Sequence, residues 1–167
     1  MSDHQNDFDC IFRPANPFDF EALHDLLTNC WVEGYSQHVA EISVARFIAE
    51  DGAGEHLRLF LPTMEVAVIK GQIVGVINQY AGYITAFSVA RPFRNCLIGS
   101  SLLHNAQNPG GCYLEVAAFN KEAIGFYECR GWKRENFRGR CLRNESSNIA
   151  YDNLKRPGCF RCLQNLG

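Results

Sequence analysis

The sequence has no apolar run of the roughly 18 or more residues that a membrane-spanning helix requires. Its first seven residues, Met-Ser-Asp-His-Gln-Asn-Asp, are polar and acidic, which does not match a signal peptide. A strong charge imbalance is also missing. The formal net charge of −2 at pH 7 gives no argument for a nucleic-acid partner or an anionic membrane surface. We therefore expect a cytoplasmic protein that binds neither nucleic acid nor membrane.

Internal repeats, low-complexity tracts and domain linkers are absent from the 167 residues as well. A chain of this length with 47% hydrophobic and 20% charged residues is typical of one soluble domain with a substantial core. We place that domain at 9–154. A flexible N-terminal tail at 1–8 is expected before it, and a C-terminal tail of unpredicted structure at 155–167 after it.

Cysteine, by contrast, is abundant, with eight residues, most of them beside apolar residues. Free cysteine behaves as a small buried hydrophobe, and thiols stay reduced in the cytosol. Cys159 and Cys162 have the C-x-x-C spacing of a zinc half-site or a redox pair. No second pair and no nearby histidine completes a tetrahedral zinc site, so we expect no bound metal.

A strand, a polar turn and a helix follow one another in the middle of the chain, which is the layout of an anion-binding site. The apolar, aromatic run 83–89 predicts the strand, and apolar residues at helical spacing predict a helix over 98–107. The turn presents Arg94 as a fixed positive charge, while Gly99 and Ser100 allow close approach of the backbone. Free N–H groups at the helix start, together with the helix dipole, favour a negatively charged ligand there.

The rest of the pattern predicts an α/β fold. Asn16 and Pro17 are typical of a helix N-terminus, and Ser36 is interpreted as the cap of a second helix over 37–50. The segment 51–54, with two glycines, is interpreted as a break. The order of elements predicts a mixed central sheet of about six to seven strands with about four helices on both faces. Further strands are predicted at 8–13, 65–70, 73–80, 112–117, 132–138 and 149–154, and a last helix at 121–130.

The turn and its flanks resemble the pyrophosphate-binding motif of the GNAT N-acetyltransferase superfamily, V-x-P-x-Y-R-G-x-G-x-G-x-x-L-L. Pro92 sits one place later than the usual proline. Asn95 and Leu97 replace the first two glycines. Asn tolerates positive φ, whereas the Cβ of Leu97 occupies a place that is usually empty, which is expected to weaken cofactor binding. The matching residues are Val89, Phe93, Arg94, Gly99, Leu102 and Leu103.

A second stretch carries a more specific resemblance. The superfamily pattern L-E-V…N-x-x-A-I-x-F-Y-x-x-x-G-F is similar to the segments 113–116, 120–127 and 131–132. Glu115 and Tyr127 are twelve positions apart, a spacing nearest to that of the ribosomal-protein N-terminal acetyltransferase branch. The resemblance covers about residues 9–154.

This resemblance implies transfer of an acetyl group from acetyl-CoA to a primary amine of a small molecule or protein, by direct attack on the thioester. It also implies that backbone groups of the strand entering the turn bind the pantetheine arm. Asn120 is then a cofactor contact, a plain helix cap, or both. The cofactor-binding residues expected on this basis are Phe87, Ser88, Val89, Arg94, Asn95, Cys96, Leu97, Ile98, Gly99, Ser100, Asn120 and Tyr127.

Two residues are candidates for the proton transfers. Tyr127, with a phenol pKa of about 10, stays protonated at neutral pH and can protonate the leaving thiolate; otherwise it is a core aromatic. Glu115 is a lone carboxylate in an apolar strand, where burial would raise its pKa and suit it to accept the amine proton. Alternatively, Glu115 faces solvent at a sheet edge or pairs with a buried arginine. The base would then be a water relay or an acid of the substrate, because the strand 83–89 lacks the acid that many relatives carry.

The sequence defines the acceptor amine and the oligomeric state less closely. In this superfamily the first two helices and their connecting loop usually recognise the substrate. Trp31, Glu33 and Tyr35 are candidates here, Glu33 to attract an ammonium group and Tyr35 to pack on it, unless all three lie in a solvated loop. A homodimer is a candidate assembly. The departures from the motif leave open a non-catalytic acyl-CoA-binding or regulatory domain, and less strongly a partner-binding module without cofactor.

Overall fold

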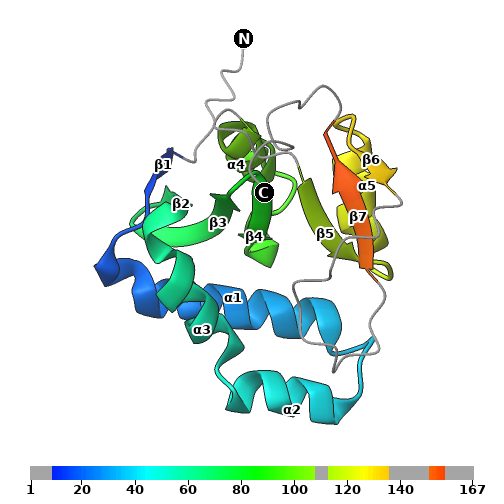
Figure 1. Ribbon diagram of the computed structural model, residues 1–167. Helices are drawn as coiled ribbons and strands as arrows, with labels where there is room; N and C mark the ends of the chain where they lie inside the picture. Colours follow the sequence, from blue (N-terminus) through cyan, green and yellow to red (C-terminus); the bar gives the residue numbers. More distant parts are fainter. Residues whose placement is uncertain (1–8, 108–112, 136–150, 157–167) are drawn as a thin grey trace.

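The computed structural model describes residues 9–107, 113–135 and 151–156. Seven strands form one mixed sheet in the order β1-β2-β3-β4-β5-β7-β6 (Figure 1). Strands β4 and β5 run parallel, and the other neighbouring pairs are antiparallel. The strands are β1 (Cys10–Pro14), β2 (Met64–Ile69), β3 (Gln72–Tyr80), β4 (Tyr83–Val89), β5 (Tyr113–Ala117), β6 (Lys133–Glu135) and β7 (Tyr151–Lys155).

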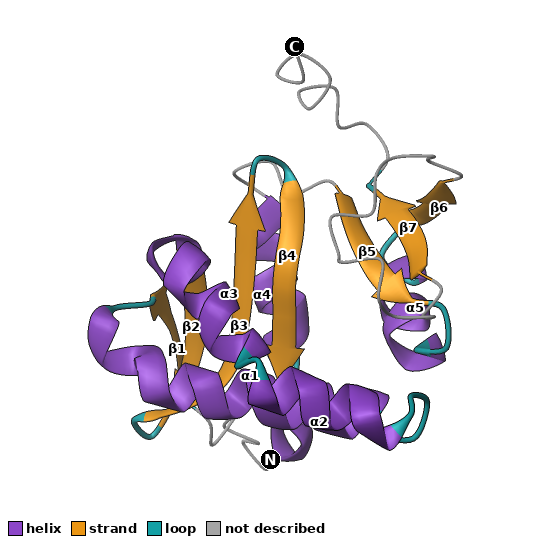
Figure 2. Ribbon diagram, turned by 60° about the horizontal axis from the view of Figure 1, so that its bottom comes forward, coloured by secondary structure: helices purple, strands orange, loops and turns teal. Residues whose placement is uncertain are grey.

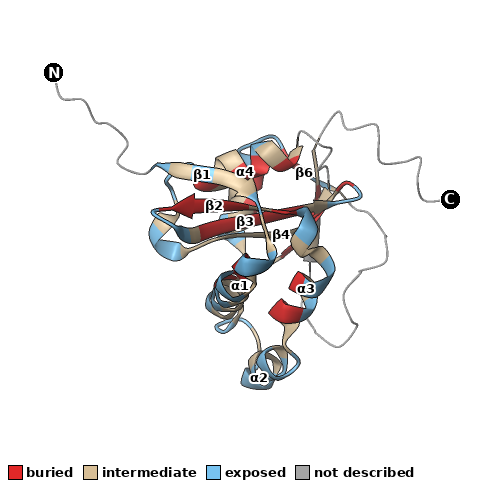
Figure 3. Ribbon diagram, turned by 90° about the vertical axis from the view of Figure 1, so that its left-hand side faces the viewer, coloured by how far each residue is buried: buried red, intermediate tan, exposed pale blue. Residues whose placement is uncertain are grey.

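Helices cover both faces of this sheet. Figure 3 shows α4 on one side of the strands and α1, α2 and α3 on the other. Side chains of α5 pack in the same core as those of α4. The predicted α/β fold, a mixed sheet with helices on both faces, is therefore confirmed. The helices are α1 (Phe20–Tyr35), α2 (Glu41–Ala49), α3 (Gly52–Phe60), α4 (Ile98–Gln107) and α5 (Lys121–Glu128).

Each face of the sheet has its own hydrophobic core. The core under α4 and α5 includes Leu102, Leu103, Ile124 and Trp132, all at most 2% exposed. A Cβ at Gly75 on β3 would lie 3.0 Å from Leu102 Cδ1, so the missing side chain lets α4 pack close to the sheet. The second core joins α1 and α3 to the other face through Leu23, Leu26, Leu57, Met64, Val66, Val68 and Val76.

The start of α1 follows the sequence pattern. Asn16 and Asp19 form a capping box over a short 3-10 turn that precedes the helix, with Pro17 in its first turn. Arg13 on β1 binds both carboxylate oxygens of Asp19, at 2.7 and 2.9 Å. The Arg13 guanidinium beside Asp19 lowers the pKa of that carboxyl. The bidentate pair ties the first strand to the first helix.

Two predictions about the next helices are wrong. The segment 51–54 is the beginning of α3, because Asp51 takes a left-handed conformation with φ of 52° and its side chain accepts from the N–H of Gly54 at 3.2 Å. A Cβ at Gly52 would lie 2.5 Å from the ring of Phe47, so this glycine permits a close contact between α2 and α3. Ser36 follows the end of α1 and does not cap α2, which begins at Glu41 after Ala40.

Several predictions fall outside the described residues. The tail at 1–8, the segment 157–167 with its C-x-x-C spacing, and the outer parts of the predicted strands 132–138 and 149–154 belong to this group. Within the described ranges, no helix combines the length and apolar character needed to cross a membrane.

Candidate active site

A cleft of about 1330 Å³ lies between the α1–α3 side of the protein and α5. Strands β4 and β5 form its floor from Ile84 to Val89 and from Leu114 to Ala117. The turn after β4 and the start of α5 close its two flanks. Every residue predicted to bind the cofactor lines this cleft except Cys96 and Ile98, and the three predicted substrate residues and both predicted catalytic residues line it too.

The cleft exists because β4 and β5 part. They pair at Tyr83–Tyr113 and Ile84–Leu114 and at no later described position, and Figure 2 shows the two strands diverging. Thr85 is skipped in the register between β3 and β4, which indicates a β-bulge at the point of divergence. Its hydroxyl accepts from Asn78 Nδ2 at 2.6 Å. The residues from Phe87 to Val89 therefore pair with β3 alone and turn their other edge toward the cleft.

The turn between β4 and α4 keeps a glycine-like backbone without the glycines. Asn95 and Leu97 both have φ of 63°, in the left-handed region. The side chain of Leu97 is 72% exposed, so it does not fill the turn. A Cβ at Gly99 would lie 3.3 Å from the ring of Phe87, so the missing side chain lets this ring pack close to the start of α4. The start of α4 is thus open to an anionic ligand.

Arg94 is held beside this turn by two contacts. Its Nε donates to the carbonyl of Val89 at 3.0 Å, and its Nη2 lies 3.5 Å from Glu33 Oε2. The structure therefore brings Glu33, predicted for the substrate, to the cofactor end of the cleft. Cys30 lies next to this pair, and burial raises the pKa of its thiol although Arg94 opposes the shift. A protonated thiol is a poor nucleophile, so the cleft offers no activated cysteine at Cys30.

The sequence interpretation missed Arg130. This exposed arginine follows α5, and its Nη2 donates to Ser100 Oγ at 2.6 Å across the cleft. Its Nη1 donates to the carbonyl of Phe126 at 2.8 Å, and its guanidinium lies 3.6 Å from the centroid of the Phe126 ring. A second positive charge thus borders the start of α4. No motif indicated it, because 30 positions separate Arg130 from Ser100 in the sequence.

Tyr127 belongs both to the core and to the cleft. Its side chain is only 6% exposed and packs against Phe126, Trp132 and Phe87, with ring centroids 5.4, 5.7 and 6.1 Å away. Burial raises the pKa of its phenol, because the phenolate would lose its hydration. The hydroxyl therefore stays protonated at any physiological pH.

Glu115 and Asn120 border the same cavity. At Glu115 strand β5 pairs with β7 alone, because its pairing with β4 ends at Leu114, and Glu115 lines the cleft in a half-buried position. The expectation of deep burial is thus met only in part. Asn120 caps α5, with its Oδ1 accepting from the N–H of Ala123 at 3.0 Å, while its side chain also borders the cleft.

One region of the cleft is aromatic, with rings from α1, α2 and the loop after β5. Trp31 stacks on Tyr35 and on Phe47, with centroids 4.7 and 3.9 Å apart. Phe119, after β5, meets Tyr35 edge to face at 5.2 Å and stacks on His38 at 4.2 Å. Trp31 and Tyr35 were predicted as substrate residues, whereas Phe47, Phe119 and His38 were not, because their positions in the sequence share no motif.

Comparison with known proteins agrees with this geometry. The family model described as "Acetyltransferase (GNAT) family" matches residues 20–132. No curated protein matches the chain significantly. The fold is similar to that of the PaiA N-acetyltransferase of Thermoplasma acidophilum in complex with coenzyme A, with a TM-score of 0.73, 18% identity, and 89% of this chain and 98% of that chain covered. It is also similar to the apo form of YjaB from Escherichia coli, with a TM-score of 0.70, 21% identity, and the same coverage of 89% and 98%.

Proposed function

The chain belongs to the acetyltransferase (GNAT) family, and on this premise we propose that it transfers an acetyl group from acetyl-CoA to a primary amine. The observation that carries the proposal is the cleft between the diverging strands β4 and β5, which ends at the positively charged turn before α4. Arg94, Arg130 and the free N–H groups of the α4 start suit the pyrophosphate. The exposed edge of Phe87 to Val89 suits the pantetheine arm.

The residues of the cleft would divide the reaction as follows. The amine nitrogen forms a bond to the thioester carbon, and the carbon–sulfur bond breaks. Backbone N–H groups near Val89 hold the developing oxyanion. Glu115 accepts the amine proton, directly or through water, and Tyr127 gives its proton to the leaving sulfur. The products are the N-acetylated amine and free CoA thiol.

Two measurements test this function. Calorimetric titration with acetyl-CoA, and with desulfo-CoA alongside, is expected to give micromolar binding. Thiol release is then followed with a panel of amines, and it is expected to depend on the amine. Absence of binding at millimolar acetyl-CoA would contradict the proposal.

A second candidate is a non-catalytic acyl-CoA-binding or regulatory domain. It is favoured by Leu97 in the cofactor turn and by the absence of an acid in β4. Such a domain binds acetyl-CoA but releases no thiol with any amine, so the two measurements separate the candidates.

Leu97→Gly is expected to raise the affinity for acetyl-CoA several-fold, because the Leu97 side chain lines the cleft beside the turn that would hold the phosphates. It is also expected to raise the free energy of unfolding by about 1 kcal/mol, because leucine at positive φ is strained. Its exposed side chain loses little packing. Asn95→Gly is the matched control: it has the same φ, but asparagine tolerates that region, so smaller changes are expected in both measurements. Equal effects of the two substitutions in calorimetry and in denaturant unfolding would contradict this explanation.

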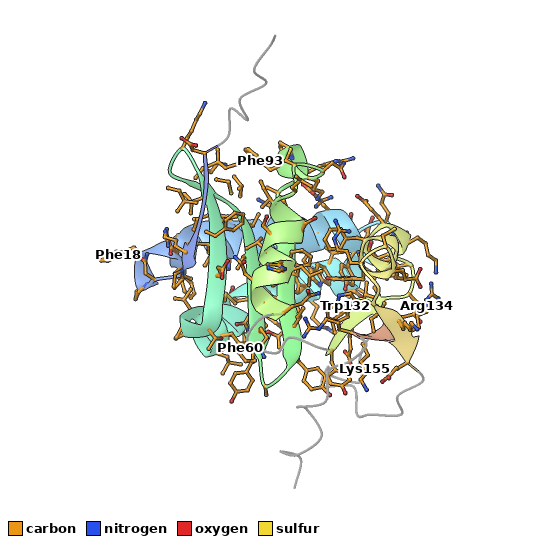
Figure 4. The ribbon with its side chains drawn as sticks, turned by 90° about the horizontal axis from the view of Figure 1, so that it is seen from above. Phe18, Phe60, Phe93, Trp132, Arg134 and Lys155 are labelled. Atoms are coloured by element: carbon orange, nitrogen blue, oxygen red, sulfur yellow. The ribbon has the colours of Figure 1, made fainter. Side chains whose placement is uncertain are left out.

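Arg130→Gln is expected to weaken acetyl-CoA binding about fivefold to twentyfold at low salt, because an exposed cation beside the phosphates is lost. The loss should shrink as ionic strength rises. Arg134→Gln is the control, since this exposed arginine pairs with Glu128 and Asp152 outside the cleft (Figure 4). Equal losses in titrations of both variants would show that Arg130 acts only through overall charge.

A further inference from the structure

The aromatic residues of the cleft lie outside both hydrophobic cores of the described chain. Trp31, Tyr35, Phe47 and Phe119 are half-buried and line the cleft, and in the described part of the chain none of them belongs to either hydrophobic core. Helix α2 has no buried residue, and the ring of its half-buried Phe47 stacks on Trp31. Phe47 also packs against Gly52 at the start of α3, but four large apolar side chains at one cavity wall offer ring surfaces to a ligand as well.

These rings also come from both sides of the cleft. Tyr35 ends α1, and His38 lies in the loop that follows, whereas Phe119 lies between β5 and α5. The contacts of Tyr35 and His38 with Phe119 therefore connect the two walls of the cleft. A ligand bound beneath them is enclosed by ring surfaces, which suits a small, flat group better than an extended polypeptide.

The charges in this region are nearly balanced. Among the described lining residues from Arg46 to Glu50 and from Leu114 to Glu122, the carboxylates are Glu50, Glu115 and Glu122, and the cations are Arg46 and Lys121. Glu33 on α1 also lines the cleft but pairs with Arg94. Arg46 and Glu50 already form an ion pair, with Nε and Oε1 4.0 Å apart. A polyamine would need several additional carboxylates to replace the hydration of its charges. An excess of one negative charge suits a ligand with a single ammonium group.

We propose that the acceptor is a small primary amine that carries an aromatic ring, with the ring bound among Trp31, Tyr35, Phe47 and Phe119 and the amine directed toward Glu115. This inference rests on the proposed acetyl transfer and defines its acceptor class. Aromatic pairs contribute beyond the area they bury, so the ring would supply most of the acceptor's affinity.

The chain has two tryptophans, which makes binding visible without turnover. Trp31 lines the cleft and Trp132 is 2% exposed in the core. In NMR spectra of the full chain saturated with CoA, 2-phenylethylamine is expected to shift the indole N–H signal of Trp31 saturably and to leave that of Trp132 in place. Trp31→Phe assigns the two signals. An unmoved Trp31 signal, or a larger response to n-butylamine or spermidine, overturns the proposal.

Turnover gives a second test. Phe119→Leu is expected to raise KM for 2-phenylethylamine about fivefold to tenfold and to change KM for n-butylamine less than about twofold. Phe18→Leu is the control, because Phe18 is 97% exposed, does not line the cleft, and stands at the periphery of the molecule in Figure 4. Equal losses with both amines would show that Phe119 acts only in packing and would overturn its role.

The two proposals can fail separately. Thiol release with spermidine or a peptide amine, but none with 2-phenylethylamine, would preserve acetyl transfer and overturn the aromatic acceptor. A saturable shift of Trp31 without thiol release from any amine would preserve the aromatic site and contradict the enzyme.

Discussion

Replacing Tyr127 with phenylalanine is expected to lower kcat by about 10²- to 10³-fold and to change the affinity for acetyl-CoA less than about threefold. The ring packs against Phe126 and Trp132, and phenylalanine preserves those contacts. Only the hydroxyl is lost, and with it the proton for the leaving sulfur. Burial would make the thiolate a stronger base by the same loss of hydration that raises the pKa of Tyr127, so transfer between the two groups remains feasible.

The pH dependence adds a check on this role. Because burial raises the pKa of the phenol, its ionisation should not reduce kcat on the alkaline side up to about pH 10. Tyr80→Phe serves as the control, since Tyr80 lies on β3 outside the cleft and is 57% exposed. Steady-state kinetics on both variants measure kcat, and calorimetry measures the affinity for acetyl-CoA. Unchanged kcat in Tyr127→Phe would leave Tyr127 as a core residue alone.

Glu115→Gln is expected to lower kcat/KM by about 10²-fold at pH 7. A primary alkyl amine with a pKa of about 10.4 is almost fully protonated there, so a base is needed before the nitrogen can attack. The loss should diminish as the pH approaches that value, because more of the amine is then neutral in solution. Glutamine has almost the same shape and keeps the backbone pairing of β5 with β7.

A matched carboxylate separates this effect from a general change of charge. Glu128→Gln removes an exposed carboxylate that pairs with Arg134 outside the cleft, and its pH–rate profile should follow that of the unmodified protein. If Glu115→Gln also follows that profile, the base is a water relay or an acid of the substrate. That result would not contradict the proposed acetyl transfer itself.

The local sequence pattern was sufficient to predict most of the helices and strands. Alternating and helical spacings identified all seven strands and four of the five described helices. The cap at Asn16 and the glycine-like turn at Asn95 and Leu97 are also local, because each depends on the conformation of a few adjacent residues. Helix α3 was missed for the same reason: two glycines read locally as a break, whereas Asp51 and the packing of Phe47 against Gly52 make that segment a helix start.

In the functional site, too, some features could be predicted from the sequence and others depend on tertiary packing. The amino-acid order was enough to identify the family motifs and to propose roles for Tyr127, Glu115 and the turn before α4. Packing alone decided that β4 and β5 part, that Glu33 meets Arg94, and that Tyr35 of α1 meets Phe119. Each of these contacts joins residues from separate elements. Whether these residues come into contact depends on how the helices pack on the twisted sheet. The spacing of residues within one segment carries no information about this packing.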